Sequence, residues 1–226
     1  HGLDHLSATS LNLYAAQPAL WVVEKLLRRR ASPGCAAHRG TAAEHGVGLG
    51  LFDPEATVAD CQAAALAEFD RLATFSTDPN RAKEREAVPS LVETALAELR
   101  QYGPPTPPRE GQRQHRVEVA LPDVPVPVIG YQDFVWDAHG IVLDLKTSLR
   151  LASNISPGHA RQGAVYVAGS NREMRFCYAT PKKVAVYALE DTTTPLLTLR
   201  HVALRLERFL RLSRDPQELV GLLCPD

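Results

Sequence analysis

Apolar positions in the first hundred residues recur every three or four places, the spacing of an amphipathic helix. Polar residues at 7–10 can cap a helix start, and Pro18 suits the first turn of the next helix. Pro- and Gly-containing segments separate the apolar stretches. The pattern predicts five helices, at about residues 11–16, 19–30, 36–51, 58–73 and 90–102.

The pattern changes after residues 103–110, where prolines are concentrated into a stiff connector. Residues 130–137 and 140–147 are alternating apolar runs around a short polar turn, which is typical of a β-hairpin. Other strands are expected at 115–121, 174–178 and 184–189, and helices at 157–167 and 197–212.

This order of elements predicts one α/β domain over residues 1–226 with a mixed sheet. Its mainly helical part covers residues 1–102, the connector covers 103–110, and the sheet and C-terminal helices occupy 111–226.

The composition is that of an ordinary globular protein, with 45% hydrophobic and 23% charged residues. A formal net charge of −1 gives no global attraction to nucleic acid, so any contact with DNA must come from local basic groups. No apolar run is long enough to cross a bilayer and no signal peptide is visible, which favours a cytoplasmic protein with no membrane partner. The basic candidates for phosphate contacts are Arg28, Arg29, Arg30, Arg39, Arg150, Arg161, Lys182 and Lys183, of which Arg150 and Arg161 lie nearest the motifs described below.

The hairpin carries the first candidate chemistry, Asp133 on one strand and Asp144 and Lys146 on the other. Side chains two apart on a strand share a face, so Asp144 and Lys146 are neighbours. A carboxylate pair with an adjacent ammonium suits metal-assisted phosphodiester cleavage, in which carboxylates hold Mg²⁺ and the lysine acts on water or on developing charge. An isolated Asp-x-Lys is also common on exposed hairpins, so further motifs must decide.

Two further motifs flank the hairpin. Gln162 and Tyr166 are four residues apart on an expected helix and therefore share a face. Upstream, Gly40-x-x-x-Glu44 places a carboxylate on another helix, with His45 next to it.

The ordered set of Gly-x-x-x-Glu, Gly-x-x-Asp, Asp-x-Lys and Gln-x-x-x-Tyr resembles the RecB-type branch of the PD-(D/E)XK nuclease superfamily, including phage exonucleases. The opening Leu6–Leu11 with Gln17-Pro18 is similar to the start of many such nucleases, so the resemblance covers nearly the whole chain. It implies a restriction-endonuclease-like core, in which a mixed central sheet is flanked by helices.

The resemblance also implies roles for the matching residues. Asp133 and Asp144 would bind Mg²⁺ or Mn²⁺, two ions in all, with the backbone carbonyl of Leu145 as a further ligand. Lys146 would be the catalytic lysine, with a pKa lowered by the nearby cations. Gln162 and Tyr166 would contact the DNA backbone or steady a metal-bound water.

The upstream metal ligand is open between two neighbours. Many relatives carry histidine where this chain has Glu44, and here the histidine falls one place later, at His45. One residue rotates a helical side chain by about 100°, so both cannot face the site equally. Glu44 is favoured because carboxylate oxygen suits Mg²⁺ or Mn²⁺ better than imidazole does, although a bulged helix could present His45.

An iron–sulfur cluster is not expected, because Gln17 stands where cluster-bearing relatives have cysteine and no C-terminal cysteine cluster is present. The scattered cysteines are expected to be reduced and mostly packed in the core. No nucleotide-binding motif appears, so no nucleotide cofactor is expected. The four cysteines are Cys35, Cys61, Cys177 and Cys224.

The sequence thus predicts a Mg²⁺- or Mn²⁺-dependent deoxyribonuclease, acting on linear, double-stranded DNA as an exonuclease in recombination or repair. The resemblance to bacterial and phage enzymes leaves room for a homo-oligomer or a single-strand annealing partner. The alternative is a catalytically silent DNA-binding or assembly subunit that keeps the nuclease fold.

Overall fold

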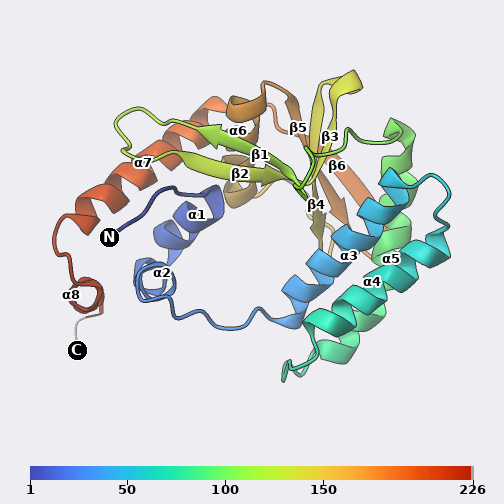
Figure 1. Cartoon of the computed structure of the whole chain (residues 1–226), viewed down its shortest axis with the longest axis horizontal. Coiled ribbons are helices and arrows are strands. Elements are labelled where there is room, and N and C mark those ends of the chain that lie inside the picture. The colour runs from blue at the N-terminus through green and yellow to red at the C-terminus, as the bar shows by residue number, and fades with distance from the viewer. Residues whose placement is uncertain (225–226) are drawn as a thin grey trace.

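Helices dominate the first hundred residues of the computed structural model, which describes residues 1–224 (Figure 1). Ser7 caps the first helix by accepting a hydrogen bond from Ser10 N–H, and Pro18 begins the second, as the sequence indicates. The helices are α1 (Ala8–Ala16), α2 (Pro18–Lys25), α3 (Cys35–Phe52), α4 (Val58–Leu72) and α5 (Arg81–Leu99), after which comes the 3₁₀ turn η1 (Arg100–Tyr102).

The strands form two sheets. β1 (His115–Val119) and β2 (Val128–Gln132) are an antiparallel pair. The second sheet has the order β3 (Phe134–Trp136), β4 (Ile141–Thr147), β5 (Glu173–Ala179) and β6 (Val184–Ala188), and the turn η2 (Asp137–His139) joins β3 to β4.

Only the β4–β5 pair of this second sheet is parallel, and helix α6 (Pro157–Ser170) makes the crossover that a parallel pair requires. Helices α7 (Thr193–Leu210) and α8 (Pro216–Gly221) follow. This mixed α/β architecture confirms the expected class, a restriction-endonuclease-like fold.

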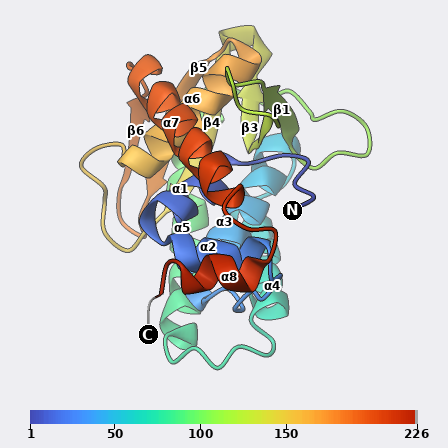
Figure 2. The ribbon, with the colours of Figure 1, turned by 90° about the vertical axis from the view of Figure 1, so that its left-hand side faces the viewer.

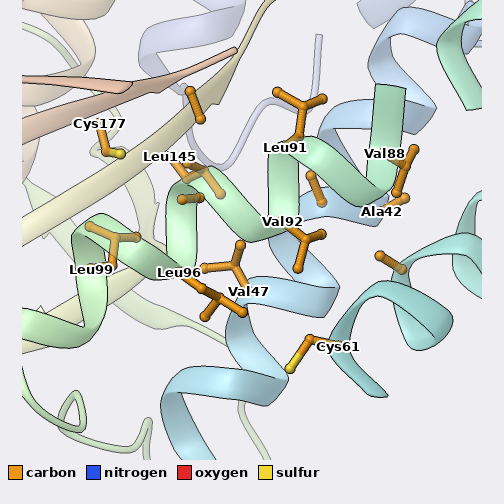
Figure 3. Packing of buried hydrophobic residues seen from close by; sticks show 14 of the residues in the cluster. Ala42, Val47, Cys61, Val88, Leu91, Val92, Leu96, Leu99, Leu145 and Cys177 are labelled. Carbon is orange, nitrogen blue, oxygen red and sulfur yellow. The ribbon is translucent and has the colours of Figure 1, made fainter. Parts of the chain in front are cut away.

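Two groups of helices flank the sheets (Figure 1). Helices α3, α4 and α5 pack together, and α3 and α5 bury apolar side chains against the four-stranded sheet, while α4 lies against α3 and α5. Figure 3 shows this core, which includes Val47 of α3, Cys61 of α4 and Leu96 of α5 together with Leu145 of β4 and Cys177 of β5. Cys61 lies on the side of the core away from the two strand residues. In Figure 2, α1, α2, α7 and α8 lie on the other side of the molecule, around a second core.

The predicted helix boundaries are off by three or four residues at the starts of α1 and α7 and differ most from the structure at two places. Helix α2 ends at Lys25, not near residue 30, because the exposed run Arg28–Arg30 has no apolar face to bury, and Arg28 takes a left-handed backbone conformation (φ 54°). Helix α5 begins nine residues earlier than the expected residue 90 and runs through Pro89. Burial of Val88, Leu91 and Val92 against α3 and α4 offsets the hydrogen bond that proline removes.

The hairpin prediction is partly wrong as well. Residues 128–132 pair with β1, and only the short strand β3 pairs with β4, so the expected first strand is divided at Asp133. At the C-terminal end the sequence pattern missed α8, a short helix whose Leu219 is fully buried.

Three of the four cysteines, Cys35, Cys61 and Cys177, are buried as expected, whereas Cys224 is exposed. Within residues 1–224, no helix combines the length and apolarity needed to cross a bilayer.

Candidate active site

Asp133 lies at the bend between β2 and β3, where the chain passes from one sheet to the other. Its Oδ2 accepts a hydrogen bond of 3.1 Å from the backbone N–H of Leu145 on β4. The carboxylate thereby takes the place of a backbone carbonyl from a neighbouring strand. The chain can change sheets at Asp133 because the backbone N–H of Leu145 still has an acceptor. The bend directs the carboxylate toward Asp144.

Asp144 and Lys146 are neighbours on the same face of β4, as their spacing predicts. The Lys146 ammonium lies 2.5 Å from Asp144 Oδ2, and the Asp144 side chain is 1% exposed. That oxygen accepts no hydrogen bond of regular geometry, so the contact with Lys146 is an ion pair and Oδ2 keeps free acceptor capacity. This carboxylate is therefore buried and only partly satisfied.

Helix α6 contributes the polar pair Gln162 and Tyr166, one turn apart. Gln162 Nε2 donates to Asp144 Oδ1 at 3.1 Å and to the Tyr166 hydroxyl at 2.8 Å. The Tyr166 hydroxyl in turn donates to the backbone carbonyl of Tyr131 on β2. Gly130 allows this approach, because a Cβ there would lie 2.6 Å from the Tyr166 ring. The chain of contacts fixes the position of Asp144 from the side opposite Lys146.

The upstream carboxylate is Glu44 on α3. Its Oε1 accepts a hydrogen bond of 3.0 Å from Gln114 Nε2, and the same nitrogen donates to Asp133 Oδ1 at 2.8 Å. His45 is exposed and lies near Glu68 of α4, away from the carboxylates. Of the two open ligands, the structure brings Glu44 to the site and leaves His45 outside it.

Burial and mutual repulsion govern the charges of this cluster. Burial, and then the charges of Asp144 and Glu44, raise the pKa of Asp133 well above its usual range. Burial and Asp144 likewise raise the pKa of Glu44, and burial raises that of Asp144 despite the opposing charge of Lys146. One ammonium does not neutralise three carboxylates, of which Asp144 is buried and Glu44 and Asp133 are partly buried.

The same charges act on Lys146. Burial alone would lower the pKa of its ammonium, but Asp144, Asp133 and Glu44 outweigh burial and raise it. The lowered pKa expected from the resemblance depends on bound cations, so it stays a prediction for the cation-loaded site.

The donor set fits a hard divalent cation. Three carboxylates converge, their raised pKa values mark excess negative charge, and Asp144 Oδ2 is buried without a regular hydrogen bond. Within residues 1–224, no three His, Cys, Asp or Glu side chains already have ligand geometry around one point. The polar contacts of these carboxylates are made by other side chains, since Gln114 bridges Glu44 and Asp133 while Lys146 contacts Asp144.

A buried ion pair joins α3 to α5. Arg39, less than two turns before Glu44, pairs with Glu84 of α5, and their side chains are only 7% and 9% exposed. Arg39 also donates a hydrogen bond of 3.2 Å to the carbonyl of Thr147, the residue after Lys146. Arg39, a candidate for DNA contact in the sequence, is thus a buried structural residue that sets where Glu44 lies.

The two favoured DNA-contact arginines lie in different surroundings. Arg150 is exposed on the loop after β4. Arg161 on α6 donates to Asn12 of α1 at 2.5 Å, so it also joins these two helices.

The sequence reasoning missed a pocket beside the site. The pocket has a volume of 370 Å³, and it is lined by Gln112, Arg113, Gln114, Arg116 and Tyr131. The connector and loop before β1 carry no periodic pattern, so only the cluster of Gln and Arg at 112–116 could have drawn attention to them.

Comparison with known families agrees with the geometry. The model of the PD-(D/E)XK nuclease superfamily matches residues 5–220, and the chain belongs to that superfamily. Its members are hydrolases that cleave phosphodiester bonds of nucleic acids and generally use divalent metal ions. Membership therefore makes this protein a nuclease by family and gives it a nucleic-acid substrate.

No curated protein matches the chain. Among solved structures, that of SSO0001 is similar at 14% identity and a TM-score of 0.39, covering 93% of this chain and 96% of the other.

Proposed function

We propose that the protein is a Mg²⁺- or Mn²⁺-dependent DNA exonuclease of the RecB-type or phage-type branch, acting in recombination or repair. The observation that carries this proposal is the convergence of Glu44, Asp133 and Asp144 on Lys146, with more buried negative charge than the lysine balances. Contributions from α3 and from the sheet to one site also support a single domain that includes the connector.

Each residue has a role in this proposal. Glu44, Asp133 and Asp144, with the Leu145 carbonyl, would hold two divalent cations, which supply Lewis-acid assistance to an attacking water and to the leaving oxygen. Lys146 would orient the attacking water through its ammonium and offset negative charge that develops on the phosphoryl oxygens. Gln162 would keep Asp144 in place, and Tyr166 would keep Gln162 in place.

The substrate would approach along the pocket next to Gln114. Arg113 supplies positive charge there, Arg116 is partly neutralised by its ion pair with Glu118, and the half-exposed ring of Tyr131 offers an apolar face to a base. Arg150, on the loop that follows β4, would contact the phosphates from another side. Arg161 would contribute to DNA binding only with the part of its guanidinium that Asn12 leaves free.

The test is digestion of linear and circular, single- and double-stranded DNA with Mg²⁺, Mn²⁺ or EDTA. Asp144→Asn and Lys146→Ala should each reduce cleavage by about 10²–10⁴-fold, because each removes a group that acts on the reacting phosphate or its cations. Lys83→Ala, which removes an exposed lysine far along the chain from the motifs, is the matched control and should cleave normally.

The products distinguish the alternatives. Digestion of linear DNA alone marks an exonuclease, and cleavage of circles marks an endonuclease. Tight DNA binding without products in either metal would instead identify a catalytically silent subunit. Wild-type cleavage by Lys146→Ala would overturn the assignment of the site.

A further inference from the structure

Gln114 is a neutral side chain that joins two carboxylates of the site. Both contacts use the same nitrogen, which donates at 3.0 Å to Glu44 and at 2.8 Å to Asp133. A primary amide nitrogen carries two hydrogens, so both of its donors are used. The opposite orientation of the amide would direct its carbonyl oxygen at two carboxylates and is excluded by chemistry.

The position of this amide matters because it lies between groups that otherwise repel each other. Glu44 and Asp133 come from different parts of the chain, α3 and the β2–β3 bend. The charge of Glu44 adds to burial and to the charge of Asp144 in raising the pKa of Asp133. Gln114 acts against that effect, since its hydrogen bond lowers the pKa of Glu44. The amide thus supplies partial positive charge at the place where a cation would bridge the two carboxylates.

The surroundings of Gln114 also allow its side chain to rotate away from the two carboxylates. It belongs to the loop directly before β1 rather than to a helix or strand, and it is only partly buried beside the open pocket that contains Arg113 and Tyr131. A rotation of its side chain into this pocket would release both carboxylate oxygens without moving α3 or β4.

We propose that Gln114 is a positioning residue that occupies the cation position between Glu44 and Asp133 in the metal-free protein and is displaced when a divalent cation binds. The amide keeps the two carboxylates at bridging distance, and it competes with the cation for the same oxygens. This inference rests on one part of the proposed function, the binding of a divalent cation by these carboxylates, and not on DNA cleavage.

The test is calorimetric titration of the metal-free protein with Ca²⁺, without DNA. Gln114→Ala should bind Ca²⁺ about tenfold more tightly than wild type, because the competing hydrogen bonds to charged groups are gone. Gln114→Glu, nearly the same size and without the donor, should also bind more tightly. Gln112→Ala, which changes an exposed glutamine of the same loop, is the matched control and should bind as wild type does.

A second readout separates competition from a purely structural role. In EDTA, Gln114→Ala should melt at a lower temperature than wild type, and saturating Ca²⁺ should remove most of the difference. Unchanged or weaker Ca²⁺ binding by both variants would overturn the proposal, since a residue that only builds the site or ligates the cation gives that result. Nuclease activity is assayed separately with Mg²⁺, so tighter Ca²⁺ binding with no DNA cleavage would leave this inference standing and remove the proposed function.

Discussion

Arg39 and Glu44 are five residues apart on α3, yet they belong to two charged groups that differ in net charge. The group of Arg39 is neutral overall, whereas the group of Glu44 carries surplus negative charge. Arg39 meets a single carboxylate, Glu84, and also donates to the Thr147 carbonyl, while its buried Nε has no hydrogen-bond partner within residues 1–224. Glu44 instead joins Asp133 and Asp144, which together face one lysine. The same helix therefore carries a balanced pair that holds structure and an unbalanced cluster that needs more positive charge.

The difference shows how buried charge can be assigned to structure or to function. A buried ion pair contributes little net stability but is costly to break, because either partner alone is an uncompensated charge. A cluster with surplus charge is destabilising in itself and persists where a ligand neutralises it. We therefore expect that removing a charge from the balanced pair lowers the free energy of unfolding, whereas removing a carboxylate charge from the cluster raises it.

The largest effect should come from breaking the balanced pair. Glu84→Gln leaves the Arg39 guanidinium buried without a counter-charge and should lower the free energy of unfolding by about 3 kcal/mol. Urea denaturation measures this loss. Glu86→Gln, on an exposed position of the same helix, should change stability by less than about 0.5 kcal/mol. Equal free energies of unfolding for the two variants would show that the Arg39–Glu84 pair does not contribute to stability.

A smaller effect of opposite sign should come from the cluster. Glu44→Gln removes one surplus charge while its side-chain oxygen can still accept from Gln114, so at pH 8 without metal it should stabilise the protein by about 1–2 kcal/mol. Chemical denaturation in EDTA is the measurement. A loss of stability comparable to that of Glu84→Gln would contradict the surplus charge of the cluster, because Glu44 would then behave as a partner in a balanced ion pair.

The stability of the protein should also depend on pH in a direction set by the raised carboxyl pKa values. Carboxyl groups with a folded-state pKa above the unfolded value bind more protons in the folded protein, so their contribution to stability falls as pH rises from about 4 through the raised pKa values. Glu44→Gln should flatten this fall. Identical slopes for variant and wild type above pH 4 would contradict the raised pKa of Glu44.

The smallest effect should come from His159 on α6, a third ionisable group inside the fold. Burial, and then the charge of Lys146, lower the pKa of His159 from 6.5 to about 4. The unfolded chain then binds more protons between these values, so the contribution of His159 to stability rises as pH rises from about 4 to 6.5.

Because His159 is only partly buried, the change across this window should be about 1 kcal/mol. His159→Gln should remove it, and the difference between the two unfolding curves isolates this effect from the carboxylates. A difference that is constant with pH would rule out the lowered pKa.

Much of the site could be predicted because its spacing is local. Asp144 and Lys146 share a face by the geometry of a strand, and Gln162 and Tyr166 by that of a helix. The choice between Glu44 and His45 could not be made from spacing, because it depends on how α3 is rotated against β4. Arg39 and Glu84 set that rotation from positions 45 residues apart.

The differences between the predicted and observed fold also arise from contacts between segments that are distant in the sequence. A helix is expected to begin at about residue 90, but packing against α3 and α4 lets α5 begin at Arg81 and continue through Pro89. Asp133 was expected inside a strand, but its side chain replaces a strand acceptor and the chain changes sheets there. Gln114 lies in a loop with no periodic pattern, so nothing local in the sequence connects it with Glu44 or Asp133. In each case the deciding contact joins distant segments.

The most direct test of the central claim is calorimetric titration of metal-free wild type and Asp144→Asn with Mn²⁺. The surplus charge of Glu44, Asp133 and Asp144 predicts Mn²⁺ binding to the wild type at this site and a loss of at least about tenfold in affinity when Asp144 is neutralised. Equal Mn²⁺ affinity in the two proteins would contradict the account, because the cluster would then not be the cation site.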